Sequence, residues 1–463
     1  MTTTAGVPVQ TGSVGTPQSY RVIWLMLGAA FVVMLNETVM GVAIPNLVDD
    51  LGITIAAAQW LTTAFMLTMA VIIPITGFLL QRFSTRQIFL SAMTLFSIGT
   101  LISALAPGFE VLLLGRVVQA SGTAMMMPLL MTTIMTLVPP ASRGRFMGRI
   151  SIVMAVAPAI GPTVSGLILS LASWRTLFWL VLPIALVMLA IGARRIENVG
   201  ETTHAPIDFL SVVLSAFGFG GLVFGLSLIG ESAASGGGIR LAVALGVGVL
   251  GIALFVWRQL VLQKQDRALL DLRIFRSRSF TIAVLLMTLM MAAMFGTIIL
   301  LPVYLQNVLL LTPVMAGALM LPGGLVMGLL APTIGRLFDT YGPRPLVIPG
   351  SMVVSASLWA LTTISVGTPP WLIVVAHVAL STGLAMMFTP LFTSALGSLS
   401  RDLYSYGSAT VGAIQQVAGA AGTALFITLL TIRTTSLEAA GASAVEAQAG
   451  GIQLAFLVGA IFS

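Results

Sequence analysis

Long apolar blocks separated by short polar loops make up nearly the whole chain. A helix needs about 20 mainly apolar residues to cross the hydrocarbon core of a bilayer. The blocks do not alternate apolar and polar residues, which excludes the strands of a membrane β-barrel. The pattern therefore predicts an all-α membrane protein with fourteen spans, beginning near Ile23, Gln59, Ile88, Val111, Phe146, Leu177, Phe209, Leu241, Phe280, Thr312, Leu346, Trp371, Gly407 and Ile452.

The final block departs from this pattern because it runs only from Ile452 to Phe462. Eleven residues at about 1.5 Å each are too short for a core of about 30 Å. We expect a truncated last helix, and the alternative is a short re-entrant segment.

Composition agrees with a membrane protein, since 58% of the residues are hydrophobic and 8% are charged. Residues 1–20 are polar and lack the apolar stretch of a cleavable signal, so the first helix is expected to insert as an uncleaved anchor. The chain has no Cys and only two His, His204 and His377. We therefore expect no metal, haem or redox cofactor.

Basic residues mark one side of the membrane. Most of the 21 Lys and Arg fall in alternate loops, and only Arg175, Arg240 and Arg433 fall in the other set. Cytoplasmic loops carry the excess of basic residues, so both termini are predicted to be cytoplasmic in a cell membrane. The charge follows helix ends and not one stripe, which argues against binding to nucleic acid.

A short polar loop occurs twice, as Gly77-Phe-Leu-Leu-Gln-Arg82-Phe-Ser-Thr-Arg86 and as Gly335-Arg-Leu-Phe-Asp339-Thr-Tyr-Gly-Pro-Arg344. Such internal repeats are typical of transporters built from repeated bundles. The second copy comes eight spans later rather than six, which predicts two extra helices between the bundles. The predicted parts are a polar cytoplasmic tail (1–20), a six-helix bundle (21–195), a linker with two helices and a basic segment (196–279), and a second six-helix bundle (280–463).

Four segments together resemble the major facilitator superfamily, in its branch of fourteen-helix drug:proton antiporters. They are Leu35-Asn-Glu37-Thr-Val-Met-Gly-Val-Ala-Ile-Pro45, Arg116-Val-Val-Gln119 with Gly122, Ala157-Pro-Ala-Ile-Gly161-Pro162-Thr-Val-Ser-Gly166, and Leu269-Leu-Asp271-Leu-Arg-Ile-Phe275. Asn36 stands where many relatives have aspartate, and Gln81 and Ser84 replace the acid and glycine of the loop motif. The segments Asn36-Glu37-Thr38 and Gln81-Arg82-Phe83 are similar to segments of the lincomycin-resistance and related multidrug exporters. The resemblance implies proton-coupled antiport by alternating access, driven by the proton gradient without a cofactor.

Glu37 is the one acid among fourteen that lies well inside a predicted span. Carboxylates within the membrane are costly and usually functional, and removal from water favours their neutral form. We predict that Glu37 carries the coupled proton, and that Arg116, with Gln119 one turn later, helps to eject it. The alternatives are that Glu37 only pairs with Arg116 to hold two helices together, and that Arg116 is a snorkelling anchor.

The resemblance also assigns structural roles to residues outside this pair. Arg82, Arg86, Asp339 and Arg344 would form a latch between neighbouring helices, or else be solvated loop charges; the first-half latch is expected to be weaker because Gln81 is uncharged. Gly161, Pro162, Ser165 and Gly166 would form a pliable, tightly packed interface between the bundles, or a plain kink. His377 is expected to be a hydrogen-bonded core residue rather than a proton carrier.

The chain offers few polar groups to a substrate. Those at a plausible cavity depth are Asn36, Gln119, Tyr304, Gln306, Gln415 and Gln416. One buried acid suits neutral, zwitterionic or monocationic amphiphiles, and flexible methionines suit varied ligands.

The chain has no phosphate-binding loop and no catalytic cluster, so neither ATP drive nor an enzyme is expected. The expected partners are lipids, protons and an amphiphilic substrate, with the chain as a monomer; the alternatives are an exporter of an endogenous metabolite and a non-transporting sensor on the same fold.

Overall fold

The computed structural model describes residues 17–198, 207–235 and 238–463, and all its regular elements in these ranges are helices. Residues 1–16 of the predicted tail and His204 lie outside the described part. Fourteen helices in the described ranges are long and apolar enough to cross a membrane, which confirms the predicted fold class.

The helices fall into three consecutive sets. The first set holds α1 (Pro17–Leu51), α2 (Ile55–Arg82), α3 (Thr85–Ala104), α4 (Phe109–Leu137), α5 (Arg143–Leu171) and α6 (Arg175–Arg195). The second holds α7 (Phe209–Ser215), the π-helical turn η2 (Ala216–Gly220) and α8 (Gly221–Ser235), which form one span, and α9 (Gly238–Leu262). The third holds α10 (Arg278–Val303) with the π-helical turn η5 (Tyr304–Val308), α11 (Pro313–Tyr341), α12 (Arg344–Leu361), α13 (Pro370–Gly397), α14 (Tyr404–Ala439) and α15 (Ala444–Phe462).

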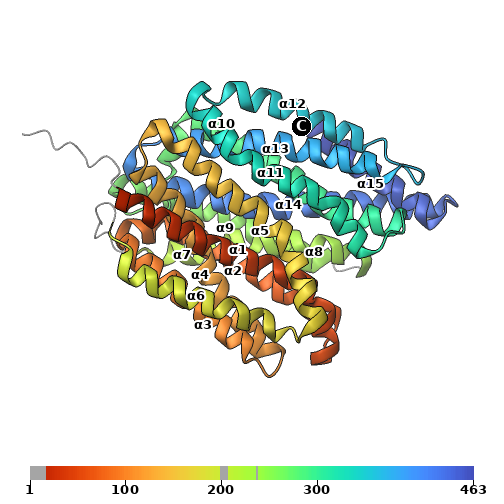
Figure 1. The fold of residues 1–463 in the computed structure, drawn as a ribbon, viewed down its shortest axis with the longest axis horizontal. Coiled ribbons are helices and arrows are strands. Elements are labelled where there is room, and N and C mark those ends of the chain that lie inside the picture. Colours follow the sequence, from red (N-terminus) through yellow and green to blue (C-terminus); the bar gives the residue numbers. More distant parts are fainter. Residues whose placement is uncertain (1–16, 199–206, 236–237) are drawn as a thin grey trace, which may run out of the picture.

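The first and third sets each pack mainly among themselves and form two bundles. In the first bundle α3 packs against α4 and α6, and α1 packs against α5. In the second, α12 packs against α13, and α14 packs against α10 and α15. The bundles meet along α5 with α11 and α2 with α14. Figure 1 shows the red-to-yellow helices of the first bundle beside the teal-to-blue helices of the second.

The repeated loop is a tight helix connection whose altered residues have a local role. Ser84, which replaces the motif's glycine, caps α3: its Oγ accepts the N–H of Gln87 at 3.3 Å, and Gln87 Oε1 accepts the N–H of Ser84 at 3.0 Å. Such a reciprocal cap satisfies two backbone donors that the first helical turn leaves free. The polar loop therefore ends one helix and caps the start of the next.

A buried network fixes the inserted helices to the α2–α14 contact between the bundles. Gln259 of α9 is fully buried; its Oε1 accepts the N–H groups of Leu269 and Leu270, and its Nε2 donates to Ser211 of α7. Asp208, just before α7, makes two hydrogen bonds with Arg258, and this guanidinium holds the pKa of Asp208 at about 2. Leu269 and Leu270 pack in a cluster that also includes residues of α2 and α14. The insert is therefore attached to the bundles at the α2–α14 contact.

The last helix is longer than the sequence analysis predicted. It begins at Ala444 and has 19 residues, which span about 28 Å at 1.5 Å per residue. Ser443 and Glu446 form a capping box at its start. The predicted start at Ile452 is wrong, because the polar residues before it belong to the first helical turns and not to a loop.

Candidate functional site

Arg116 lies at the centre of a buried polar cluster that joins the first four helices. Its side chain on α4 belongs to a residue that is 1% exposed, and Nη1 donates to Asn36 Oδ1 of α1 at 3.2 Å and to Gln119 Oε1 at 2.7 Å. Gln119 Nε2 donates to Thr100 Oγ1 of α3 at 2.7 Å. The Phe65 ring of α2 covers the guanidinium, with its centroid 4.0 Å from Cζ. A cation removed from water is thus stabilised by amide oxygens and an aromatic face.

Small residues bring α3 and α4 close enough for these contacts. A β-carbon on Gly99 would lie 2.4 Å from the backbone nitrogen of Gln119, and one on Gly122 would lie 2.3 Å from the carbonyl oxygen of Ala92. One on Gly115 would lie 2.4 Å from Ser103 Oγ. Larger residues at these positions would separate the helices, since real β-carbons do not approach other atoms this closely. The glycines therefore set how closely α3 and α4 pack, and with it the position of Arg116 relative to α3.

Glu37 follows Asn36 on α1 but takes no part in the direct contacts of Arg116. Its side chain is half-buried, and within the described ranges it makes no hydrogen bond and no ion pair within 4 Å. It is close enough to Arg116 for an electrostatic interaction. Arg116 Nε is buried without a hydrogen-bond partner among the described residues. The direct pairing considered from the sequence is therefore absent, and Asn36 is the residue of α1 that binds Arg116.

The antiporter motif on α5 packs against the same part of α1. A β-carbon on Gly161 would lie 2.2 Å from Thr38 Oγ1, and the buried Ser165 donates to the carbonyl of Val39 at 2.9 Å. Gly166 faces open space, and Pro162 continues the helix. These contacts join α5 to α1 within one bundle. The predicted location between the bundles is wrong, because the motif lies on the face of α5 that is turned away from α11.

Asp339 joins the bundles where α11 ends and α5 begins. Its Oδ1 accepts the N–H of Gly144 at 2.7 Å, and its Oδ2 accepts the N–H of Arg145 at 2.9 Å. A carboxylate at a helix N-terminus is favoured by the free N–H groups and by the helix dipole. Gly335, one turn earlier, permits the approach, since a β-carbon there would lie 2.2 Å from the carbonyl oxygen of Gly144.

Gln81 makes the corresponding contact between α2 and α14. Its Nε2 donates to the carbonyl of Asp402 at 2.5 Å and to Ser405 Oγ at 2.9 Å. Of the other predicted latch residues, Arg86 donates to the carbonyl of Ala193 within the first bundle. Arg82 lies over the ring of Phe83, and Arg344 is exposed at the start of α12.

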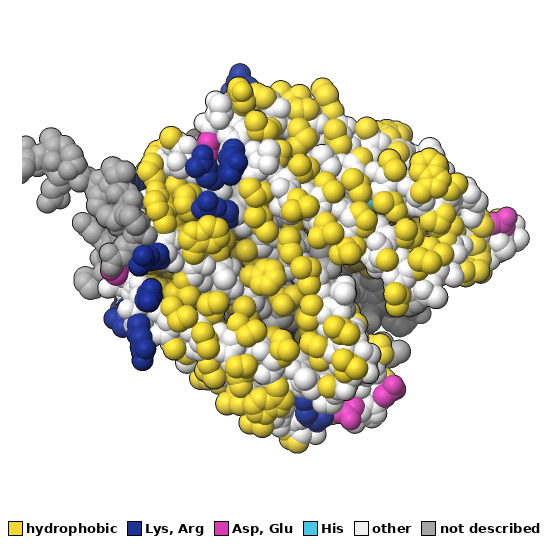
Figure 2. Space-filling view, in the orientation of Figure 1, with side chains coloured by type: hydrophobic (Ala, Val, Ile, Leu, Met, Phe, Trp, Pro, Cys, Tyr) yellow, Lys and Arg dark blue, Asp and Glu magenta, His cyan; other side chains and the backbone are white. Residues whose placement is uncertain are grey.

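Two hydroxyl pairs continue the contact between the bundles. Ser151 of α5 lies 2.7 Å from Thr389 of α13, and Thr132 of α4 lies 2.8 Å from Ser408 of α14, in each case between the hydroxyl oxygens. We call these pairs, with the Asp339 and Gln81 contacts, the basic-end seam. Figure 2 shows most Lys and Arg side chains on the visible face at this end, while the surface at the opposite end divides into two lobes. The structure is therefore closed between the bundles at the basic end.

The predicted cavity residues do not form one group. Asn36 and Gln119 are engaged by Arg116, and Tyr304 is buried with its hydroxyl donating to the carbonyl of Ser365 at 2.6 Å. Gln306 is half-buried in η5, and Gln416 Nε2 donates to Met69 Sδ across the two bundles at 3.6 Å.

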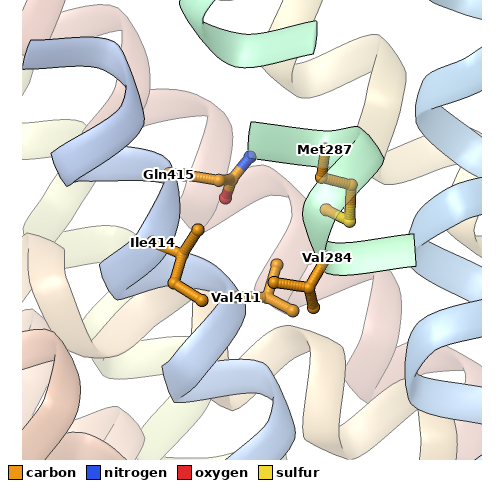
Figure 3. Close-up of a pocket in the computed structure, with 5 residues that line it drawn as sticks. All are labelled: Val284, Met287, Val411, Ile414 and Gln415. Carbon is orange, nitrogen blue, oxygen red and sulfur yellow. The ribbon is translucent and has the colours of Figure 1, made fainter. Parts of the chain in front are cut away.

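Gln415 borders a narrow apolar gap between α10 and α14, which Figure 3 shows with its lining residues Val284, Met287, Val411, Ile414 and Gln415. The gap has no room for a water molecule. His377 packs against Gly323 of α11, and its Nδ1 is buried without a hydrogen-bond partner among the described residues. In this conformer Gln415 and His377 are both half-buried.

Comparison with known proteins places the chain among membrane transporters. The pattern of the Major Facilitator Superfamily matches residues 26–423. The chain is 42% identical over 447 residues to lincomycin resistance protein LmrB of Listeria monocytogenes, covering 96% of this chain and 94% of that protein. It is 39% identical to LmrB of Bacillus subtilis, covering 95% and 93%. It is 31% identical to a multidrug resistance protein B homolog of Mycobacterium tuberculosis, covering 89% and 76%.

Two solved structures share the fold at low sequence identity. The human organic anion transporter MFSD10 (TETRAN) aligns with a TM-score of 0.67 at 14% identity, covering 96% of this chain and 100% of that one. The proton:xylose symporter XylE aligns with a TM-score of 0.63 at 15% identity, covering 96% and 94%. At these identities the likeness concerns the arrangement of helices alone.

Proposed function

The chain belongs to the major facilitator superfamily, and from that premise we propose that it exports hydrophobic or amphipathic small molecules from the cell in exchange for protons. The names of its relatives, which refer to lincomycin and multidrug resistance, support export of antibiotic-like compounds. One observation supports proton coupling: Glu37 is half-buried beside Arg116, and the hydrogen bonds of Arg116 go to neutral amides and not to this carboxyl.

The orientation follows from the basic residues. With the basic end in the cytoplasm, α1 begins on the cytoplasmic side and α15 runs towards that side, and the closed basic-end seam supports an outward-facing conformer. Protonation of Glu37 from outside then accompanies substrate release. Opening of the seam exposes Glu37 to the cytoplasm, where the nearby positive charge of Arg116 favours loss of the proton. The deprotonated carboxylate is then ready to bind the next substrate.

The proton gradient supplies enough free energy for resistance. One proton moving through about 150 mV provides about 3.5 kcal/mol, since 100 mV corresponds to about 2.3 kcal/mol per charge. This sustains a concentration ratio of about 300-fold, at about 1.4 kcal/mol for each factor of ten. A single carboxylate suits a neutral or monocationic amphiphile, which includes lincosamide-like antibiotics. All the groups used come from one chain, so a monomer suffices.

An accumulation experiment tests the proposal. Cells that lack other pumps and express this chain are expected to accumulate less lincomycin and less of a cationic dye than cells with an empty vector. A protonophore is expected to remove the difference, because the driving force is the proton gradient. Equal accumulation with and without the chain across a panel of amphiphiles would contradict export, and a difference that survives the protonophore would contradict proton coupling.

Weakening the basic-end seam is expected to shift the protein toward the inward-facing conformer. Asp339→Asn replaces a carboxylate that accepts two backbone N–H groups with a neutral amide. The loss of a charge-assisted contact is worth about 1–2 kcal/mol, or about a 5- to 30-fold change in the ratio of conformers. The chain has no Cys, so Ser151→Cys gives a single thiol buried in the seam. Thiol labelling is expected to be faster by that factor.

The matched control is Glu438→Gln, which removes an exposed acid at the opposite end of α14. With Ser151→Cys as the label site, its labelling rate is expected to equal that of Ser151→Cys alone. Equal rates for the Asp339→Asn and control proteins would show that the carboxylate does not hold the bundles together.

A further inference from the structure

Three arginines lie close together where α5 meets α11 at the basic-end seam. Arg145 and Arg149 lie one turn apart near the start of α5, and Arg336 lies on α11 beside Gly335, where the two helices touch. Arg145 and Arg336 are both close enough to Arg149 for electrostatic repulsion. None of the three guanidinium groups donates a hydrogen bond or forms an ion pair within the described residues. We call these residues the arginine triad.

The nearest acid does not neutralise the triad. Asp339 interacts electrostatically with Arg145, but both of its oxygens accept backbone N–H groups at the start of α5. One carboxylate therefore faces three guanidinium groups, which leaves a local charge of about +2. Such an arrangement is unfavourable by itself, and an external anion would stabilise it.

Aromatic residues place the triad at the level of lipid headgroups. The guanidinium Cζ of Arg149 lies 4.6 Å from the ring centroid of Trp24 and 4.4 Å from that of Phe146. Trp24 is 55% exposed on α1, and the Phe146 ring stacks on Tyr20. Trp and Tyr concentrate where the hydrocarbon meets the headgroups. The Arg149 side chain thus lies over an aromatic surface that faces the edge of the bilayer.

We propose that the arginine triad binds the phosphate of an anionic phospholipid from the cytoplasmic leaflet, and that the bound lipid holds the basic-end seam closed. The cytoplasmic leaflet is rich in such headgroups. Guanidinium groups bind phosphate through paired N–H donors. Because the triad has two members on α5 and one on α11, only the closed seam presents all three together. A ligand that binds one conformer better shifts the population toward it.

The test uses the full chain with Ser151→Cys, reconstituted in nanodiscs of phosphatidylcholine with or without 30% phosphatidylglycerol. Phosphatidylglycerol is expected to slow thiol labelling about tenfold, because it favours the closed seam. The triple variant Arg145→Gln, Arg149→Gln and Arg336→Gln is expected to label at one rate in both lipids. The matched control removes three other exposed arginines of the same end, Arg194→Gln, Arg195→Gln and Arg401→Gln, and is expected to keep the lipid effect.

Three results would overturn the assignment. In the first, the control variant loses the lipid effect as fully as the triad variant, which would indicate diffuse attraction. In the second, inorganic phosphate in pure phosphatidylcholine slows labelling as much as phosphatidylglycerol does, which would indicate a free-anion site. In the third, phosphatidylglycerol has no effect on the Ser151→Cys protein without further changes. The site depends on the proposed orientation, but its readout is labelling and not transport. Failure here leaves the accumulation experiment unaffected, so the two proposals can fail separately.

Discussion

Glu37→Gln is expected to abolish proton-driven export while leaving the protein in the membrane. The amide has nearly the shape of the carboxyl, and Glu37 makes no hydrogen bond or ion pair in the described structure that the change would remove. The effect on stability is therefore expected to stay within about 0.5 kcal/mol. Without a group that takes up the proton, the substrate gradient is expected to fall from about 300-fold to about 1. The substrate gradient is measured as the uptake of a fluorescent substrate into energised inverted vesicles.

The pH dependence of binding gives a second readout of the same residue. If the deprotonated carboxylate binds substrate, the affinity of the purified protein rises with pH as the proton leaves Glu37, and the Gln variant loses this dependence. The matched control is Glu110→Gln, an exposed acid in the first turn of α4, which is expected to transport as the unaltered protein does. Unchanged export by Glu37→Gln would remove this residue from the mechanism.

The number of spans could be predicted from the sequence because lipid imposes a simple constraint. Each span must present about 20 apolar residues, so fourteen blocks give fourteen helices. Helix ends were harder to predict, since polar residues belong to the helix wherever it extends beyond the hydrocarbon. The start of α15 was placed too late for this reason, although Ser443 and Glu446 three residues apart were a visible capping signal.

The candidate site was predictable only in part. Glu37 and Arg116 could be recognised because charges in apolar blocks are rare, but their partners could not. Phe65 of α2 and Thr100 of α3 complete the buried polar cluster around Arg116. A single sequence does not show which helices touch. The signal that was available is the row of small residues on α3 and α4, which marks close helix packing.

The antiporter motif shows why a motif does not locate an interface. On α5, Gly148 contacts α11 and Gly161 contacts α1. Thirteen residues at 3.6 per turn place these glycines about 220° apart, on nearly opposite faces of the helix. The sequence predicted close packing at Gly161, but the partner depends on how the helix is rotated, and tertiary packing alone decides this.

Arg116→Met is expected to reduce proton-driven export at least tenfold, through loss of the positive charge near Glu37. Methionine keeps much of the apolar volume but leaves Asn36 Oδ1 and Gln119 Oε1 without their donor, at a cost of about 1–3 kcal/mol each. Arg116→Lys keeps the charge but loses the planar contact with Phe65, so an intermediate loss is expected. The amount of folded protein is taken from gel filtration, and export is expressed per folded molecule. This separates the loss of coupling from the loss of stability.

The control for charge removal is Arg175→Met, whose ion pair with Asp50 is partly exposed and therefore worth about 1 kcal/mol or less. The change also removes a hydrogen bond to the carbonyl of Ala106. It is expected to export normally. The double variant Glu37→Gln with Arg116→Met decides how Arg116 acts. The readout is the substrate affinity of the purified protein, because export by Glu37→Gln is already expected to be lost. If Arg116 acts only by driving the proton from Glu37, the double variant binds substrate as Glu37→Gln alone does. Weaker binding by the double variant would instead show that Arg116 serves the folded cluster or the substrate independently of the carboxylate.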